Sequence, residues 1–174
     1  MFVRILGDGF LSIVDDWQPV LIVLAIISIA LGNIIAIAQT NIKRMLAYST
    51  ISHMGFLLLG LLSFTATEQA EHSGFSDAMF YVISYVLMSM GVFGMVILLG
   101  RREAEADELS DYQGLSERNP WFAFIMLVYM FSLAGVPPFV GFWAKLYVLK
   151  DVVGAGLTWL AAFAVFFTII GAYY

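Results

Sequence analysis

Residues 132–145 read Ser-Leu-Ala-Gly-Val-Pro-Pro-Phe-Val-Gly-Phe-Trp-Ala-Lys, and this stretch decides the fold. It lies inside a long apolar run, residues 121–149, that contains two adjacent prolines. Proline lacks a backbone N–H and clashes with the preceding helical turn, so the pair should break the helix. The residues of the predicted break are Gly135, Pro137, Pro138 and Gly141. Broken backbone at membrane depth is tolerated only where protein or a water-filled cavity surrounds it. The sequence therefore predicts an interrupted helix inside a membrane protein.

A single lysine, Lys145, follows the break within the same apolar run. A lysine in a membrane segment is costly to bury and by default indicates a functional site. Secondary transporters place their ion sites at discontinuous helices, whose ends expose unpaired backbone groups. We therefore predict that Lys145 is the proton site of a charge-moving protein. The alternative is a lysine that snorkels to the outer interface beside Lys150.

The composition is that of an integral membrane protein. Hydrophobic residues make up 61% of the 174 residues and charged residues 12%, against about 25% charged in a soluble domain. A membrane helix needs about 20 mostly apolar residues. We predict a single all-α transmembrane domain, a bundle of about five helices. The predicted spans are residues 19–39, 45–64, 78–100, 121–149 (broken at Pro137-Pro138) and 155–174, with residues 1–6 as the tail of a preceding helix. Because the last span stops while still apolar, we expect a piece of a longer protein.

The charges in the loops predict the orientation. Lysine and arginine mark the cytoplasmic side of a membrane protein, whereas acidic residues count for little. Basic residues lie at 40–44 and at both ends of 101–120, while residues 7–18 and 65–77 are acidic without Lys or Arg. We therefore place the loops 40–44 and 101–120 in the cytoplasm.

Two further basic residues are candidates for proton transfer. His53 lies near the middle of its predicted span, and histidine has the pKa range of a proton relay. The alternative is a buried histidine bonded to a helix neighbour. Lys43 lies at a corner between two predicted helices. It is either turned inward toward a polar axis or an anchor at the cytoplasmic interface.

Three polar side chains, Tyr81, Tyr85 and Ser89, lie four residues apart on one face of the third predicted span. We interpret them as a candidate polar axis that holds a chain of water molecules. Ordinary polar packing between membrane helices is the alternative.

Several site types are absent from the sequence. It has no cysteine, so it can form no disulfide or iron–sulfur cluster of its own. It has no phosphate-binding or dinucleotide-binding glycine motif and no His/Glu metal spacing. We expect no cofactor, metal or nucleic acid bound to this chain.

Two stretches resemble the antiporter-like membrane subunits of respiratory complex I, the proton-translocating NADH:quinone oxidoreductase. Residues 39–56 read QTNIKRMLAYSTISHMGF and are similar to a helix corner of that family. Residues 132–147 read SLAGVPPFVGFWAKLY and are similar to its broken helix. The resemblance covers essentially the whole chain, with both motifs in the family's order.

The resemblance implies most of the second of two inverted repeats, with Lys145 at the position of the family's proton-site lysine. It implies a multi-pass protein of the bacterial inner membrane that couples quinone reduction to proton pumping. The partners would be the other membrane subunits of the complex and the lipid bilayer. Flavin and iron–sulfur clusters would lie in partner subunits and the quinone would act at the level of the complex, so the chain would be part of an enzyme without a redox centre of its own.

Two other functions are compatible with the same residues. One is a subunit of a multi-subunit cation/proton antiporter, which shares the fold and both motif types. The other is a structural membrane scaffold that conducts nothing.

Overall fold

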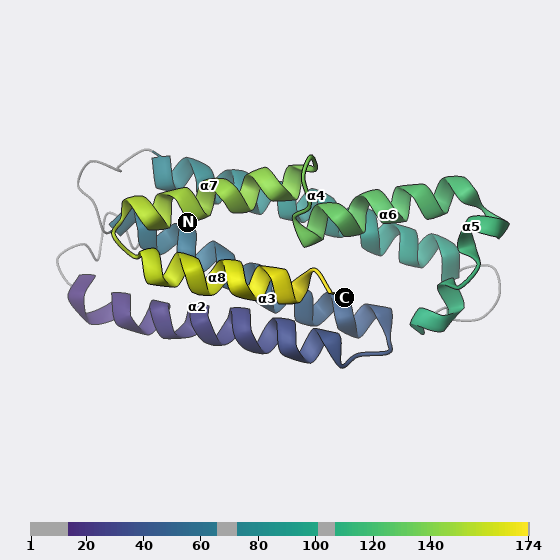
Figure 1. Cartoon of the computed structure of the whole chain (residues 1–174), viewed down its shortest axis with the longest axis horizontal. Coiled ribbons are helices and arrows are strands. Elements are labelled where there is room, and N and C mark those ends of the chain that lie inside the picture. Colours follow the sequence, from purple (N-terminus) through teal and green to yellow (C-terminus); the bar gives the residue numbers. More distant parts are fainter. Residues whose placement is uncertain (1–13, 66–72, 101–106, 174) are drawn as a thin grey trace.

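The computed structural model describes residues 14–65, 73–100 and 107–173, which form a helical bundle (Figure 1). Helix α2 spans Val14–Ile37 and helix α3 spans Ile42–Thr65, and the two lie side by side across a short corner. Helix α4, Ser73–Gly100, packs on the other side of α3. The central position of α3 brings its polar residues into the interior.

A structured loop follows α4 and contacts the α2–α3 corner. It contains the 3₁₀-helix η3, Leu109–Tyr112, and the short helix α5, Leu115–Arg118. The Ile42 N–H donates to Asp107 O at 2.8 Å, and the Leu109 N–H donates to Thr40 O at 2.9 Å. These bonds join the loop to the start of α3.

The broken helix consists of two rods of 15 residues each, α6 at Pro120–Ala134 and α7 at Val140–Gly154. At 1.5 Å per residue each rod is about 22 Å long, shorter than the ~30 Å apolar core of a bilayer. The rods follow one another along α4 (Figure 1). Helix α6 ends at Gly135, whose φ of 84° is left-handed and suits a residue without a Cβ. The Pro137–Pro138 bond is cis.

Helix α8, Thr158–Gly171, completes the bundle against α2 and α7. The buried apolar side chains form two clusters. One gathers residues mainly of α2, α3, α7 and α8 around Phe56 and Val148, and the other gathers residues mainly of α3, α4 and α6 around Met45 and Val92. Along α3, the buried Ser49, Ser52 and His53 lie between residues of the two clusters. We call this level of the bundle the polar layer.

The predicted fold class is confirmed: an all-α membrane protein with one helix broken around Pro137-Pro138. Helices α2, α3 and α4 contain stretches long and apolar enough to cross a membrane, at Asp16–Ile37, Ile42–Ser63 and Ser76–Gly100. The helices begin earlier than the spans predicted at 45–64 and 78–100, because helical backbone continues past the apolar part. Helix α8 begins three residues later than its predicted span, after Gly156 at φ 80°. The predicted helix tail at residues 1–6 lies outside the described residues.

Candidate functional site

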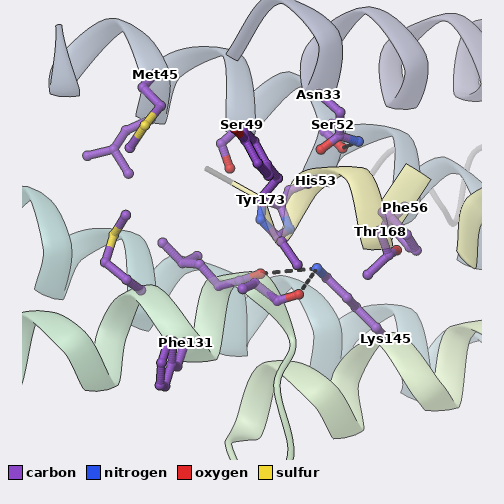
Figure 2. Close-up of a pocket in the computed structure, with 16 residues that line it drawn as sticks. Asn33, Met45, Ser49, Ser52, His53, Phe56, Phe131, Lys145, Thr168 and Tyr173 are labelled. Carbon is purple, nitrogen blue, oxygen red and sulfur yellow. Dashed lines mark hydrogen bonds between the residues drawn. The ribbon is translucent and has the colours of Figure 1, made fainter. Parts of the chain in front are cut away.

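Lys145 lies in the second turn of α7 and points back to the end of α6. Its side chain is buried, and its Nζ donates to Leu133 O and to Ala134 O, each at 3.0 Å (Figure 2). The last carbonyls of a helix have no intrahelical partner and form the negative end of its dipole. The end of α6 therefore supplies both the acceptors and the partial charge that hold the ammonium group.

The same backbone turn makes room for the lysine stem. A Cβ built on Gly135 would lie 3.0 Å from Lys145 Cδ. On the other side, Lys145 Nζ lies 5.6 Å from the centre of the Phe56 ring, within range of a cation–π contact. Within the described residues, Lys145 makes no ion pair. The site is thus a buried cation held by backbone dipoles and an aromatic face.

His53 connects α3 to α4 in the polar layer. Its Nδ1 lies 2.7 Å from the Tyr81 hydroxyl, and its ring lies against Tyr85 with centroids 4.7 Å apart. The Tyr85 hydroxyl donates to Thr50 Oγ1 at 2.7 Å, and Thr50 donates to Leu46 O at 2.9 Å. His53 is therefore hydrogen-bonded across to α4, and a second, separate chain from Tyr85 through Thr50 to Leu46 O joins the same two helices.

A cavity of about 170 Å³ joins His53 to Lys145. This volume is several times the ~30 Å³ that a water molecule occupies in the liquid, so the cavity has room for several water molecules. Figure 2 shows Lys145 and His53 facing the cavity from opposite sides. The polar side chains that also line it are Asn33, Ser49, Ser52, Thr168 and Tyr173. The cavity offers polar partners on several sides, which a chain of water molecules requires.

Asn33 is a lining residue that sequence reasoning missed. It is buried on α2, where its Nδ2 donates to Ile29 O and to Ser52 Oγ, each at 2.8 Å. The available signal was an amide in a predicted span, residues 19–39, that has no charged residue. A polar residue of this kind in a membrane segment usually faces the protein interior.

The other predicted site residues are distributed unevenly around this centre. Tyr81 and Tyr85 are buried in the polar layer, whereas Ser89 is half-buried one turn further along α4 and donates to Val86 O of its own helix. Lys43 lies at the α2–α3 corner, 47% exposed, with its Nζ 2.6 Å from Asp107 Oδ1. The structure thus brings together Lys145, His53 and the two tyrosines, but not Lys43 or Ser89.

Gly141 fixes how closely the two rods pass. A Cβ at this position would overlap the carbonyl group of Ser132.

Among the described residues, no group of three or more His, Asp or Glu side chains comes together as a metal site. Two titratable side chains, Lys145 and His53, line one cavity, and this arrangement suits the holding and transfer of a proton.

The chain is similar in sequence to curated proteins that share one name. A curated relative from Cupriavidus taiwanensis, named NADH-quinone oxidoreductase subunit N, is 57% identical over 176 residues, covering 100% of this chain and 36% of that protein. The chain thus spans about a third of the length of the curated relatives it matches.

Solved structures match the fold. A chain of respiratory complex I from Thermus thermophilus matches with a TM-score of 0.76 and 31% identity, over 90% of this chain and 34% of that one. A chain of the Mrp complex from Dietzia sp. matches with a TM-score of 0.83 and 26% identity, over 98% of this chain and 30% of that one.

The family model described as NADH:quinone oxidoreductase/Mrp antiporter, transmembrane, matches residues 1–171. A broken helix, a buried lysine at its break and a match along nearly the whole chain lead to one conclusion: this chain belongs to the NADH:quinone oxidoreductase/Mrp antiporter transmembrane family.

Proposed function

We propose that this chain forms part of a proton-translocating membrane subunit of NADH:quinone oxidoreductase, and that Lys145 carries the proton. The observation that supports this proposal is the buried Lys145 ammonium on the carbonyls of Leu133 and Ala134. Burying a charge without a carboxylate partner is costly. A cation held in this way can lose or gain its proton when the charges around it change. The relatives named subunit N support this choice within the family.

In the proposed mechanism the chain moves protons but no electrons. Oxidation of NADH by flavin and iron–sulfur clusters, and reduction of quinone, would take place with partner subunits of the complex. A proton would pass between Lys145 and His53 through water in the cavity, and the Tyr81 hydroxyl would extend this path to α4. Lys43 would act at the α2–α3 corner, away from this path. Coupling would reach the polar layer through neighbouring membrane subunits.

The proposal includes an orientation in the bacterial inner membrane. The loops 40–44 and 101–120 carry five of the eight Lys and Arg residues and would face the cytoplasm. In this orientation the Lys43–Asp107 ion pair lies in the cytoplasmic loops. The exposed apolar side chains of α2, α4 and α6 would contact lipid or other membrane subunits.

The test is NADH-driven acidification of inverted membrane vesicles that contain the full-length protein in its complex. We expect Lys145→Ala to reduce proton pumping through this subunit by about 100-fold or more, the lower end of the range for a lost proton-transfer group. The matched control is Lys150→Ala, because Lys150 is an exposed lysine on the same helix. Assembly is checked on a native gel, and NADH oxidation is measured in parallel. Normal pumping in Lys145→Ala would leave the scaffold function as the better account.

A second candidate function is cation/proton antiport, because the Mrp complex chain has a higher TM-score than the complex I chain. The two functions differ in their driving force. Transport that depends on a sodium gradient and continues without NADH would favour antiport. Transport that stops without NADH would favour the complex I function.

A further inference from the structure

Ser132 joins three helices at the break. It is a buried residue in the last turn of α6. Its Oγ accepts a hydrogen bond from the Gly141 N–H of α7 at 3.3 Å, and its hydroxyl donates to Met88 Sδ of α4 at 2.7 Å. A hydroxyl has one donor and two acceptor sites. Both bonds can therefore form at the same time.

The bond to Gly141 satisfies a backbone N–H group in the first turn of α7. The first N–H groups of a helix have no intrahelical partner, and a side-chain oxygen at the cap position usually accepts from one of them. The cap residue of α7 is Phe139, whose side chain has no oxygen. Ser132 supplies the missing oxygen from a different helix.

The residues that follow Ser132 provide the acceptors for the lysine. Leu133 and Ala134 accept from Lys145, which lies about one helical turn after Gly141. Residues 132–134 thus hold α7 at two successive levels. The hydroxyl of Ser132 fixes the beginning of the rod, and the next two carbonyls bind the ammonium group one turn later.

We propose that Ser132 is a positioning residue for Lys145: its hydroxyl holds the start of α7 against the end of α6 and thereby keeps the ammonium group on the carbonyls of Leu133 and Ala134. This inference rests on the proposed role of Lys145 in proton transfer. An alanine at 132 is slightly smaller and fits the same position, but it would leave the Gly141 N–H without this acceptor and Met88 Sδ without this donor. The rod could then slide or rotate relative to the carbonyls.

The experiment uses the full-length protein in its complex, with Ser132→Ala, Ser132→Thr and Lys145→Ala in inverted vesicles. We expect Ser132→Ala to lower the number of protons pumped per NADH oxidised by about fivefold, the change that corresponds to one lost hydrogen bond. The pH at which pumping is half-maximal should move by about half a unit or more. Ser132→Thr keeps the hydroxyl and should restore both values. The matched control is Ser63→Ala, because Ser63 is also buried and its hydroxyl donates to Gly60 O of its own helix.

Amide hydrogen exchange of the peptide that contains Gly141 provides a readout independent of pumping. Exchange should be faster in Ser132→Ala than in the parent and unchanged in Ser132→Thr. If Ser132→Ala does not assemble, Ser132→Cys replaces it, because sulfur keeps the size of the side chain but is a weak acceptor. The same loss of pumping and faster exchange are then expected.

The outcomes separate this inference from the proposed function. Loss of pumping in Lys145→Ala with parent-like pumping, pH profile and exchange in Ser132→Ala would overturn the role of Ser132 and leave that of Lys145 intact. Normal pumping in Lys145→Ala would overturn both roles. Loss of pumping in both variants, with rescue by Ser132→Thr and faster Gly141 exchange in Ser132→Ala, would support both.

Discussion

The α2–α3 corner and the helix break each hold a lysine, and they hold it in opposite ways. At the corner, Lys43 is 47% exposed and pairs with the Asp107 carboxylate. At the break, Lys145 is 9% exposed and binds two backbone carbonyls. Water and a counter-charge stabilise the first lysine, whereas helix-end dipoles stabilise the second.

This difference separates anchoring from function. An exposed ion pair contributes about 0–1 kcal/mol and tolerates the loss of either partner. A buried cation depends on the geometry around it, because no solvent replaces a lost partner. Mutations near the break should therefore lower the free energy of unfolding strongly, by an amount that depends on the size of the new side chain. Mutations at the corner should lower it slightly, by an amount that depends on salt and pH.

The largest effect is expected from Gly141→Ala at the break. The new methyl group would overlap the Ser132 carbonyl, so α6 and α7 would have to move apart. We expect the free energy of unfolding to fall by about 3 kcal/mol, at the upper end for overpacking. Thermal unfolding of the full-length protein in detergent, followed by circular dichroism, measures it. Gly94→Ala is the control, because a Cβ there meets nothing within 4 Å; equal destabilisation by the two variants would contradict the close crossing.

Tyr81→Phe in the polar layer should have the next largest effect. It removes the hydroxyl that lies 2.7 Å from His53 Nδ1 and leaves that buried nitrogen without this partner. The expected loss of stability is about 2 kcal/mol, within the usual range for a buried polar group that loses its bond. Tyr85→Phe should cost less, because its partner Thr50 keeps a bond to Leu46 O. The same unfolding measurement compares the two, and a larger loss in Tyr85→Phe would argue against a central role for His53.

Lys43→Ala at the corner should cost only about 0.5 kcal/mol at low salt. The effect should shrink at high salt, because ions screen an exposed pair. A double-mutant cycle with Asp107→Asn at two salt concentrations isolates the pair energy. A salt-independent coupling energy of several kcal/mol between Lys43 and Asp107 would contradict an exposed pair and would mean that Lys43 is held as a buried cation, like Lys145.

The smallest effect on stability is expected from Tyr112→Phe, in the loop that contacts the corner, and it should change with pH only in the alkaline range. Burial, followed by the nearby carboxylates of Asp107 and Asp111, raises the pKa of Tyr112 above its usual 10.0. The native state then disfavours the phenolate. The contribution of Tyr112 to stability is fully present below pH 10.0 and is lost as the pH rises through the folded-state pKa. Stability curves of the parent and of Tyr112→Phe should diverge only above this pH; divergence near neutral pH would contradict the assignment.

The fold could be predicted largely from local signals. Pro137 and Pro138 predicted the break, and the break occupies residues 135–139 between α6 and α7. Apolar runs predicted the long helices because membrane helices must be apolar over a defined length. The docking of the loop onto the corner could not be predicted, because two of its bonds, Ile42 N–H to Asp107 O and Leu109 N–H to Thr40 O, are made by backbone groups, which every sequence has. The Lys43–Asp107 ion pair forms only once the fold has brought the two residues together.

Some residues of the candidate site could likewise be predicted from the sequence, and others could not. Lys145 and His53 stand out because charged or titratable residues are rare in membrane helices. Their neighbours Asn33 and Thr168 come from α2 and α8, and only the packing of these helices brings them to the cavity. The hydroxyl of Ser132 was visible in the sequence, but its bond to Gly141 depends on the angle between two rods. The transport roles of Lys145, His53 and Lys43 stay predictions.

The acceptors of Lys145 have a consequence for genetics. Leu133 and Ala134 bind the lysine through main-chain oxygens, and position 134 is already alanine. A library of side-chain replacements keeps these oxygens in every member. Such a screen would detect the loss of the donor, Lys145, but it could not remove the two acceptor oxygens. Testing the acceptors requires a change in the backbone itself, such as an ester in place of an amide.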